Sequence, residues 1–375
     1  FRYHNTFKAG NPIEYRLNDS LNVYSFQQHL FFKLPHHWYL QYGAWYHNRE
    51  KQTPASMSTT PVFTALQNDR SLRQFVRASR LYKKSSFEWV AAYFTDSLSY
   101  SEIDNGNDSV LKHSGIRTSN TYLSGFHKWS LSENLTWENG IDYEYQTAKV
   151  ESYSGIAHES RLAAFTQIKY RYGKIETNGS YRQVFYSMTG PKSLFATSLQ
   201  YHLPIIGLIA KAQVSNKFRF PTLNDRYWTP GGNPNLLPEH GYGYDLGLSW
   251  NSLSDSRLSI NLGSLLFIQH INDWIQWVPV GTYWAPRNVR QVKCQGMELN
   301  LNGNYTLNAL HLSAKTMYTY TESLDMSLTD VMARSERQLA YVPLHLLKVQ
   351  TGIGYHRLEA SLSYKYTSQR FTTDD

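Results

Sequence analysis

The amino-acid sequence predicts an all-β fold, a transmembrane antiparallel up-and-down β-barrel with about 17 strands. Three observations support this prediction. Aromatic residues make up 15% of the 375 residues, although the mean hydropathy of the chain is only -0.51. Apolar and polar residues alternate along most of the chain, and the connections between alternating segments are short and long in turn. A sheet with one apolar face and one wet face explains all three.

The alternation has a period of two residues, as in a β-strand whose successive side chains point to opposite faces. Before a central insert, apolar residues share one face: Ile206, Leu208, Ala210, Ala212, Val214, Phe218 and Phe220. After the insert the pattern resumes with Tyr242, Tyr244, Leu246, Leu248 and Trp250. Such segments match or exceed the roughly 9 to 11 residues that a tilted strand needs to cross a bilayer.

The connections are of two kinds. Short ones are predicted at 35–37, 83–86, 173–174, 203–205 and 355–357. Longer polar links are predicted at 51–65, 102–114, 220–239, 279–286 and 322–335. Tight turns at one rim and long loops at the other are typical of an outer-membrane barrel.

Aromatic residues gather beside the predicted short turns, where Trp38, Tyr39, Trp129 and Trp250 lie. Tyr and Trp favour the membrane interface, so these residues predict an aromatic girdle. The alternative is a soluble sandwich with a Tyr-rich surface, which the regular change between short and long links disfavours. Barrels of single bacterial chains have even strand numbers, so an odd count near 17 predicts that strands of a larger barrel are missing.

Other classes of protein fit the sequence less well. No run of about eighteen apolar residues predicts a membrane-spanning helix. The given residues contain no initiator Met and no signal-type leader, so Phe1 is expected to begin a mature or truncated product. Cys294 is the one cysteine, and no metal-binding Cys/His motif is present. The net charge of +8 is scattered, which favours anionic lipid or ligand over nucleic acid. No GxSxG, HExxH or Walker pattern indicates an enzyme.

The central insert contains the most specific motif in the chain. "NKFRFPTLNDRYW", followed by "GGNPNLLPEHGYGYDLG", resembles the barrel signature of TonB-dependent outer-membrane receptors. The matching residues are Arg219, Pro221, Thr222, Leu223, Gly232, Asn233, Pro234, Leu236, Pro238 and Glu239. Prolines stop sheet pairing and stiffen a loop, whereas Gly231 and Gly232 let the chain reverse. Arg219 and Glu239 bracket the loop at its base, where either an ion pair or a plug contact pins the loop or both residues are solvated rim charges.

Two later stretches resemble the same family in the expected order. "WIQWVPVGTYWAPRNVRQVKCQGMELNL" is similar to a hairpin that ends in Asn, a basic strand and Gly-x-Glu, here Asn288, Gly296 and Glu298. "YVPLHLLKVQTGIGY" is similar to a strand opened by Tyr-x-Pro-x-His. The resemblance covers essentially the whole of residues 1–375 as barrel and is greatest to the cobalamin and siderophore branch. It implies a 22-stranded barrel whose N-terminal plug and first and last strands are absent here.

The resemblance implies a receptor that imports a bulky, scarce nutrient across the bacterial outer membrane. Cobalamin is the first expectation and a ferric siderophore or haem the second; a passive porin-type channel is the alternative. The implied partners are the TonB–ExbB–ExbD complex acting through the plug, outer-membrane lipid or lipopolysaccharide, a small-molecule nutrient and a surface lipoprotein. No enzyme activity and no nucleic acid are expected.

Ligand contacts are expected from aromatic residues on the long loops, because rigid rings give a large contact area at low entropic cost. The candidates are Tyr227, Trp228, Trp274, Trp277, Tyr283 and Trp284; an upper aromatic girdle is their alternative role. His158 is a further candidate, for haem or a cobalt ligand. No resident cofactor or metal is predicted, apart from a loop calcium near Asp104 and Asp108, whose spacing does not match an EF-hand.

Overall fold

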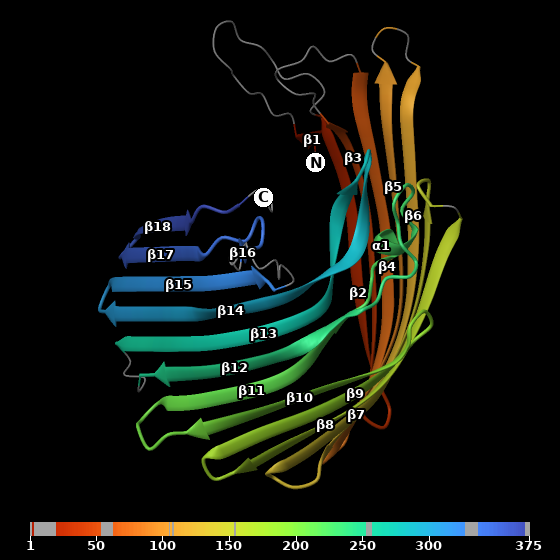
Figure 1. Cartoon of the computed structure of the whole chain (residues 1–375). Helices are drawn as coiled ribbons and strands as arrows, with labels where there is room; N and C mark the ends of the chain where they lie inside the picture. Colours follow the sequence, from red (N-terminus) through yellow and green to blue (C-terminus); the bar gives the residue numbers. More distant parts are fainter. Residues whose placement is uncertain are drawn as a thin grey trace, which may run out of the picture.

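The computed structural model describes residues 2–3, 20–53, 63–104, 106, 109–153, 155–252, 257–326 and 337–371. These residues form one 18-stranded sheet and a single short helix within the described ranges. Figure 1 shows the sheet curving round into a barrel-type wall. No helix in the described residues is long and apolar enough to cross a membrane.

The elements follow one another in chain order. They are β1 (Arg2–Tyr3), β2 (Leu21–Leu34), β3 (Trp38–Thr53), β4 (Phe63–Leu81), β5 (Ser85–Asp104), β6 (Val110–Ser130), β7 (Leu135–Val150), β8 (Ile156–Tyr172), β9 (Ile175–Tyr186), β10 (Gly190–His202), β11 (Leu208–Arg219), α1 (Leu223–Tyr227), β12 (Glu239–Asn251), β13 (Leu258–Val280), β14 (Tyr283–Leu307), β15 (Leu310–Asp325), β16 (Arg337–Gln338), β17 (His345–Tyr355) and β18 (Leu358–Thr367).

The topology is an antiparallel meander in which each strand pairs with the next along the chain. β16 and β17 pair with different parts of the same edge of β15, so they share one place in the sheet. The 18 strands therefore occupy 17 places (18 less one), which confirms the predicted count of about 17. The number 22 stays a prediction.

The predicted short turns are confirmed, and two of the long links are not. The link expected at 279–286 is mostly strand, because β13 continues to Val280 and β14 begins at Tyr283. The link expected at 102–114 is shorter than predicted, since β5 reaches Asp104 and β6 starts at Val110. Backbone pairing overrides local composition here, and the strands run beyond the length that a bilayer requires.

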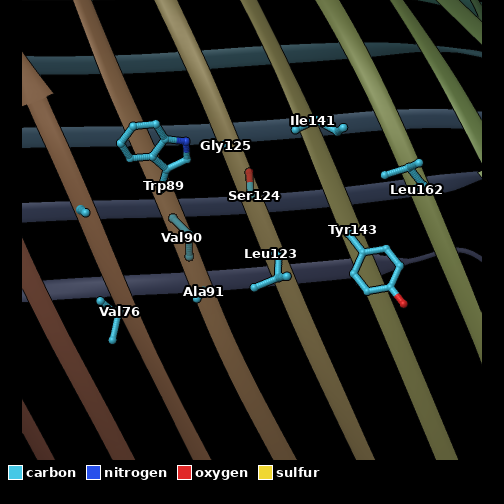
Figure 2. Close-up of a pocket in the computed structure, with 11 residues that line it drawn as sticks. Val76, Trp89, Val90, Ala91, Leu123, Ser124, Gly125, Ile141, Tyr143 and Leu162 are labelled. Carbon is cyan, nitrogen blue, oxygen red and sulfur yellow. The ribbon is translucent and has the colours of Figure 1, made fainter.

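One face of the sheet, here called the outer face, is apolar and exposed. On β12 it carries Tyr242, Tyr244, Leu246 and Leu248, each at least 49% exposed. Figure 2 looks onto this face at β4 to β8, with the blue strands of the opposite wall behind it. The outer face is therefore on the outside of the curve, where exposed apolar side chains fit contact with lipid.

The tryptophans beside the short turns lie on the outer face. Trp129 and Trp137 stack with ring centroids 6.5 Å apart, on strands that meet at one such turn. The indole Nε1 of Trp250 donates a hydrogen bond of 3.1 Å to the carbonyl oxygen of Ile206 in another. A ring in lipid with its polar tip at the rim is the arrangement that an aromatic girdle requires.

The opposite face, here called the inner face, carries ion pairs. Arg73 and Arg77 alternate on β4 with outward Val76, and they pair with Asp96 at 3.4 Å and Glu88 at 3.5 Å. Arg49 on β3 pairs with Asp69 on the neighbouring β4, and Arg182 on β9 reaches across β8 to Asp142 on β7, both at 2.7 Å. Charges on this face avoid hydrocarbon, so the period-two alternation separates a lipid side from a wet side.

Candidate ligand-binding site

The loop between β11 and β12 is closed at its base by an ion pair. Arg219 and Glu239 face each other in register, and the guanidinium binds both carboxylate oxygens, with Nε donating to Oε2 at 2.7 Å. Glu239 is only 4% exposed, and it also accepts a hydrogen bond of 2.9 Å from the backbone N–H of Ile275. The alternative of two solvated rim charges is therefore wrong.

Helix α1 begins at a capping box immediately after buried Pro221. The Thr222 hydroxyl accepts from the backbone N–H of Asp225, and the Asp225 carboxylate accepts from the N–H and hydroxyl of Thr222, each at 2.8 Å. The other Asp225 oxygen accepts a hydrogen bond of 2.9 Å from Trp277 Nε1 on β13. Five residues would not hold a helix alone, so these bonds position it.

The second half of the loop packs against the β13–β14 hairpin. A Cβ at Gly231, whose φ is +116°, would lie 2.2 Å from the backbone oxygen of Trp284, so only glycine fits here. Asn288 holds the loop from β14: its amide accepts from the N–H of Leu237 at 2.8 Å and donates to the oxygens of Leu237 and Asp273. Leu236, which lies in the loop between Gly231 and Leu237, is 2% exposed.

A pocket of about 530 Å³ opens where this loop meets the β7–β8 connection. Its wall includes Tyr153, His158, Arg226, Tyr227, Trp228 and Pro234. The Tyr153 hydroxyl donates to Asn224 Oδ1 at 2.5 Å. Burial and the nearby Asp225 carboxylate raise the pKa of Tyr153, which keeps this hydroxyl protonated as a donor. Two segments far apart in sequence thus form one fixed wall.

The pocket wall contains one arginine, Arg226, and two of its side-chain N–H donors lack a hydrogen-bond acceptor among the described residues. Arg226 is 2% exposed, its guanidinium lies 5.6 Å from the ring centroid of Tyr186, and its Nε and Nη2 are buried without a hydrogen-bond partner among the described residues. The nearby carboxylate of Glu159 is already bound by Arg161 and the Tyr186 hydroxyl. A buried unpaired guanidinium is costly, so this position suits an anionic partner.

The predicted site residues separate into three groups. Tyr227 and Trp228 line the pocket, as does His158. Trp277 binds Asp225, and Tyr283 and Trp284 adjoin Gly231 without lining the pocket. Trp274 follows an irregularity in the β13–β14 register, also outside the pocket.

The motif residues likewise divide between loop and wall. The residues that shape or hold the loop are Pro221, Thr222, Leu236, Pro238, Glu239 and Asn288. Two others line the pocket, Gly232 and Pro234. Asn233 donates its backbone N–H to the backbone carbonyl oxygen of Asp225 at 2.8 Å. Gly296 and Glu298 lie away from the loop in β14, opposite Phe267 and Leu265; a Cβ at Gly296 would meet the Phe267 ring at 2.7 Å.

The sequence did not single out Arg226 or Tyr153. Arg226 stands within the motif, beside Tyr227, but nothing local shows that it is buried. Tyr153 reaches the loop through contacts between residues far apart in sequence, with Asn224 across 71 residues and with the Tyr227 ring, and such contacts have no sequence signal.

Metal binding receives no support from the described residues, which contain no group of three or more His, Cys, Asp or Glu side chains placed to hold an ion. Asp104 accepts a hydrogen bond of 2.6 Å from the N–H of Gly106. Asp108 lies outside the described residues, so the calcium expectation stays a prediction.

The family model for the TonB-dependent receptor-like β-barrel matches residues 2–375. The chain belongs to this family. The receptor is 25% identical over 339 residues to the vitamin B12 transporter BtuB of Photobacterium profundum, a match covering 88% of this chain and 52% of that protein. A second BtuB, from Vibrio vulnificus, is 25% identical over 197 residues, 51% of this chain and 31% of the relative. The chain thus spans about half the length of the first relative, and the second match covers a smaller share of its relative.

Solved structures show the same fold at low identity. The haemophore receptor HasR of Serratia marcescens, solved with its haemophore HasA and haem, has a TM-score of 0.74 at 13% identity, covering 93% of this chain and 64% of that one. The FrpB iron transporter of Neisseria meningitidis has a TM-score of 0.71 at 10% identity, covering 97% and 62%. The family is one of receptors and transporters rather than enzymes.

Proposed function

We propose that this chain forms the wall and ligand-receiving loops of an outer-membrane importer for cobalamin, with haem or a ferric siderophore as the second choice. Family membership and the names of the two BtuB relatives support this assignment. In this proposal a plug, outside the residues given, blocks the lumen, and the TonB–ExbB–ExbD complex supplies the energy that moves it. Binding alone cannot drive uphill transport, because a ligand shifts an equilibrium only by its differential affinity.

The observation that carries the proposal is the pocket beside α1. Tyr227 and Trp228 offer aromatic surface on a loop held by the Arg219–Glu239 pair and Asn288, so little ordering is required on binding. Arg226 adds a buried cation whose Nε and Nη2 have no hydrogen-bond partner among the described residues. Cobalamin carries a nucleotide phosphate and haem carries propionates, and either group suits a guanidinium. The pocket volume, about 530 Å³, accommodates part of such a ligand.

Titration of the full-length receptor with cyanocobalamin, haem and a panel of ferric siderophores tests the proposal. One of them is expected to bind, and Trp228→Ala and Arg226→Met are each expected to weaken that binding by tenfold or more, as for central contacts of an interface. Arg226→Met should not destabilise the barrel, because it replaces an unpaired buried charge with an apolar side chain of similar size. Intrinsic fluorescence measures the affinity, and thermal denaturation measures stability.

Trp284→Ala is the matched control, since Trp284 is 59% exposed and lies outside the pocket. If cobalamin is the ligand, dicyanocobinamide, which lacks the nucleotide phosphate, is expected to bind the wild type and Arg226→Met alike. Absence of binding by every probe contradicts the import proposal. Liposome swelling in small sugars, caused by the full-length protein, would instead indicate a porin-type channel.

A further inference from the structure

The buried side chain of Tyr186 connects the barrel wall to the β11–β12 loop. Tyr186 is 3% exposed at the end of β9, where it pairs in register with Arg161 of β8. Its ring centroid lies 4.1 Å from that of Phe220, at the start of the loop. Two guanidiniums lie over the same ring, those of Arg161 at 5.1 Å and Arg226 at 5.6 Å from its centroid. One tyrosine ring therefore contacts both a wall arginine and the arginine of the pocket.

The hydroxyl of Tyr186 is bound to a buried carboxylate of the wall. It donates a hydrogen bond to Oε2 of Glu159, which is 3% exposed. The other oxygen, Glu159 Oε1, accepts a hydrogen bond of 2.5 Å from Nη2 of Arg161. Both oxygens of this carboxylate thus have a donor from the wall, and neither of these two donors is Arg226.

The acids closest to the two arginines in the chain or in space are also occupied. Asp225, which precedes Arg226 in α1, accepts hydrogen bonds from other residues at both carboxylate oxygens. Glu144 lies 3.8 Å from Nη1 of Arg161 and already accepts from two side-chain amides. Nε and Nη2 of Arg226 consequently have no described partner, although the residue is 2% exposed.

We propose that Tyr186 is a positioning residue that keeps the pocket selective for an anionic group, because its hydroxyl occupies the Glu159 oxygen that would otherwise pair with Arg226. A buried carboxylate requires donors, and the unpaired donors of Arg226 over the same ring are suited to replace the lost hydroxyl. Glu159 and Arg226 would then neutralise each other. This inference rests on the proposed function, in which Arg226 receives the anionic group of the ligand, and it adds the residue that keeps Arg226 free.

Inorganic phosphate is the probe, so the test does not depend on which nutrient is imported. Calorimetric titration of the full-length receptor at constant ionic strength measures its affinity. The wild type is expected to bind phosphate at a site that Arg226→Met removes. Tyr186→Phe keeps the ring and loses only the hydroxyl. It is expected to weaken phosphate binding by about tenfold or more, because the anion must then displace Glu159 from Arg226.

A second substitution separates this role from a purely structural one. The double variant Tyr186→Phe, Glu159→Gln has no carboxylate to pair with Arg226, so its phosphate affinity is expected to return to within about threefold of the wild type. A defect in packing would persist in the double variant. Tyr122→Phe is the matched control, since it removes a hydrogen bond of 3.1 Å to Asp142, another carboxylate bound by an arginine. Its expected effect on phosphate affinity is below about twofold, as for a distant site.

A crystal structure of the Tyr186→Phe receptor is expected to place a Glu159 oxygen within hydrogen-bond distance of Arg226. Three results overturn the inference: no phosphate binding by the wild type, equal phosphate affinity of the wild type and Tyr186→Phe, or a loss in Tyr186→Phe that Glu159→Gln does not reverse. If the phosphate titrations give the expected order and no nutrient binds, only the proposed function is rejected.

Discussion

Replacement of Arg219 by methionine is expected to lower the free energy of local unfolding of the β11–β12 loop by about 3 kcal/mol. The cost arises at Glu239, whose side chain is 5% exposed and would lose its cation. Only the hydrogen bond from the N–H of Ile275 would then remain among its described partners. Hydrogen exchange of the Ile275 amide and of the loop amides in the full-length receptor measures this change.

Three variants establish that the loss comes from an unpaired buried charge. The double variant Arg219→Met, Glu239→Gln is expected to be more stable than Arg219→Met alone, because the glutamine amide oxygen still accepts from Ile275. Arg49→Met removes a cation from the more exposed Arg49–Asp69 pair and is expected to cost less than about 1 kcal/mol. Equal effects of Arg219→Met and Arg49→Met would contradict the role of the motif pair.

A second large effect is expected from Leu246→Arg on β12. Leu246 is 59% exposed on the outer face near the middle of its strand, where an arginine facing lipid costs about 2 to 4 kcal/mol. Reversible unfolding of the full-length barrel in phospholipid vesicles measures the loss through tryptophan fluorescence.

Gln213→Arg is the matched control for this substitution. Gln213 lies opposite Asp245 on the inner face, so the new guanidinium faces water and a carboxylate. The expected change is below about 0.5 kcal/mol, as at an ordinary surface position. A destabilisation of Gln213→Arg equal to that of Leu246→Arg would show that the two faces do not differ in environment.

The sequence was sufficient for the fold because the signal is repeated in almost every strand. Period-two alternation, as at Leu246 and Leu248, predicts both the strand and the face, and tight turns fix the antiparallel order. The exceptions are at the long-loop rim. The β13–β14 hairpin extends past Pro279 because Pro279 and Trp284 pair in register, although proline and glycine there predict a loop.

The candidate site was predictable only where chemistry is local. The Arg219–Glu239 base and the turn at Gly231 follow from the motif itself. The role of Trp277 does not, since its hydrogen bond to Asp225 joins residues 52 positions apart. Arg226 differs again: its importance comes from burial against Tyr186 and from neighbouring carboxylates that are already occupied, and both are properties of the folded chain.

The most direct test of the whole account is the environment of successive residues along β11. Single cysteines at positions 210 to 215, introduced into full-length receptor carrying Cys294→Ser, are spin-labelled in vesicles, and collisions with oxygen and with a water-soluble nickel complex are measured. Oxygen access is expected to dominate at Ala210, Ala212 and Val214, and nickel access at Lys211, Gln213 and Ser215. An accessibility profile without this alternation would contradict a wall with one face in lipid and the other in water.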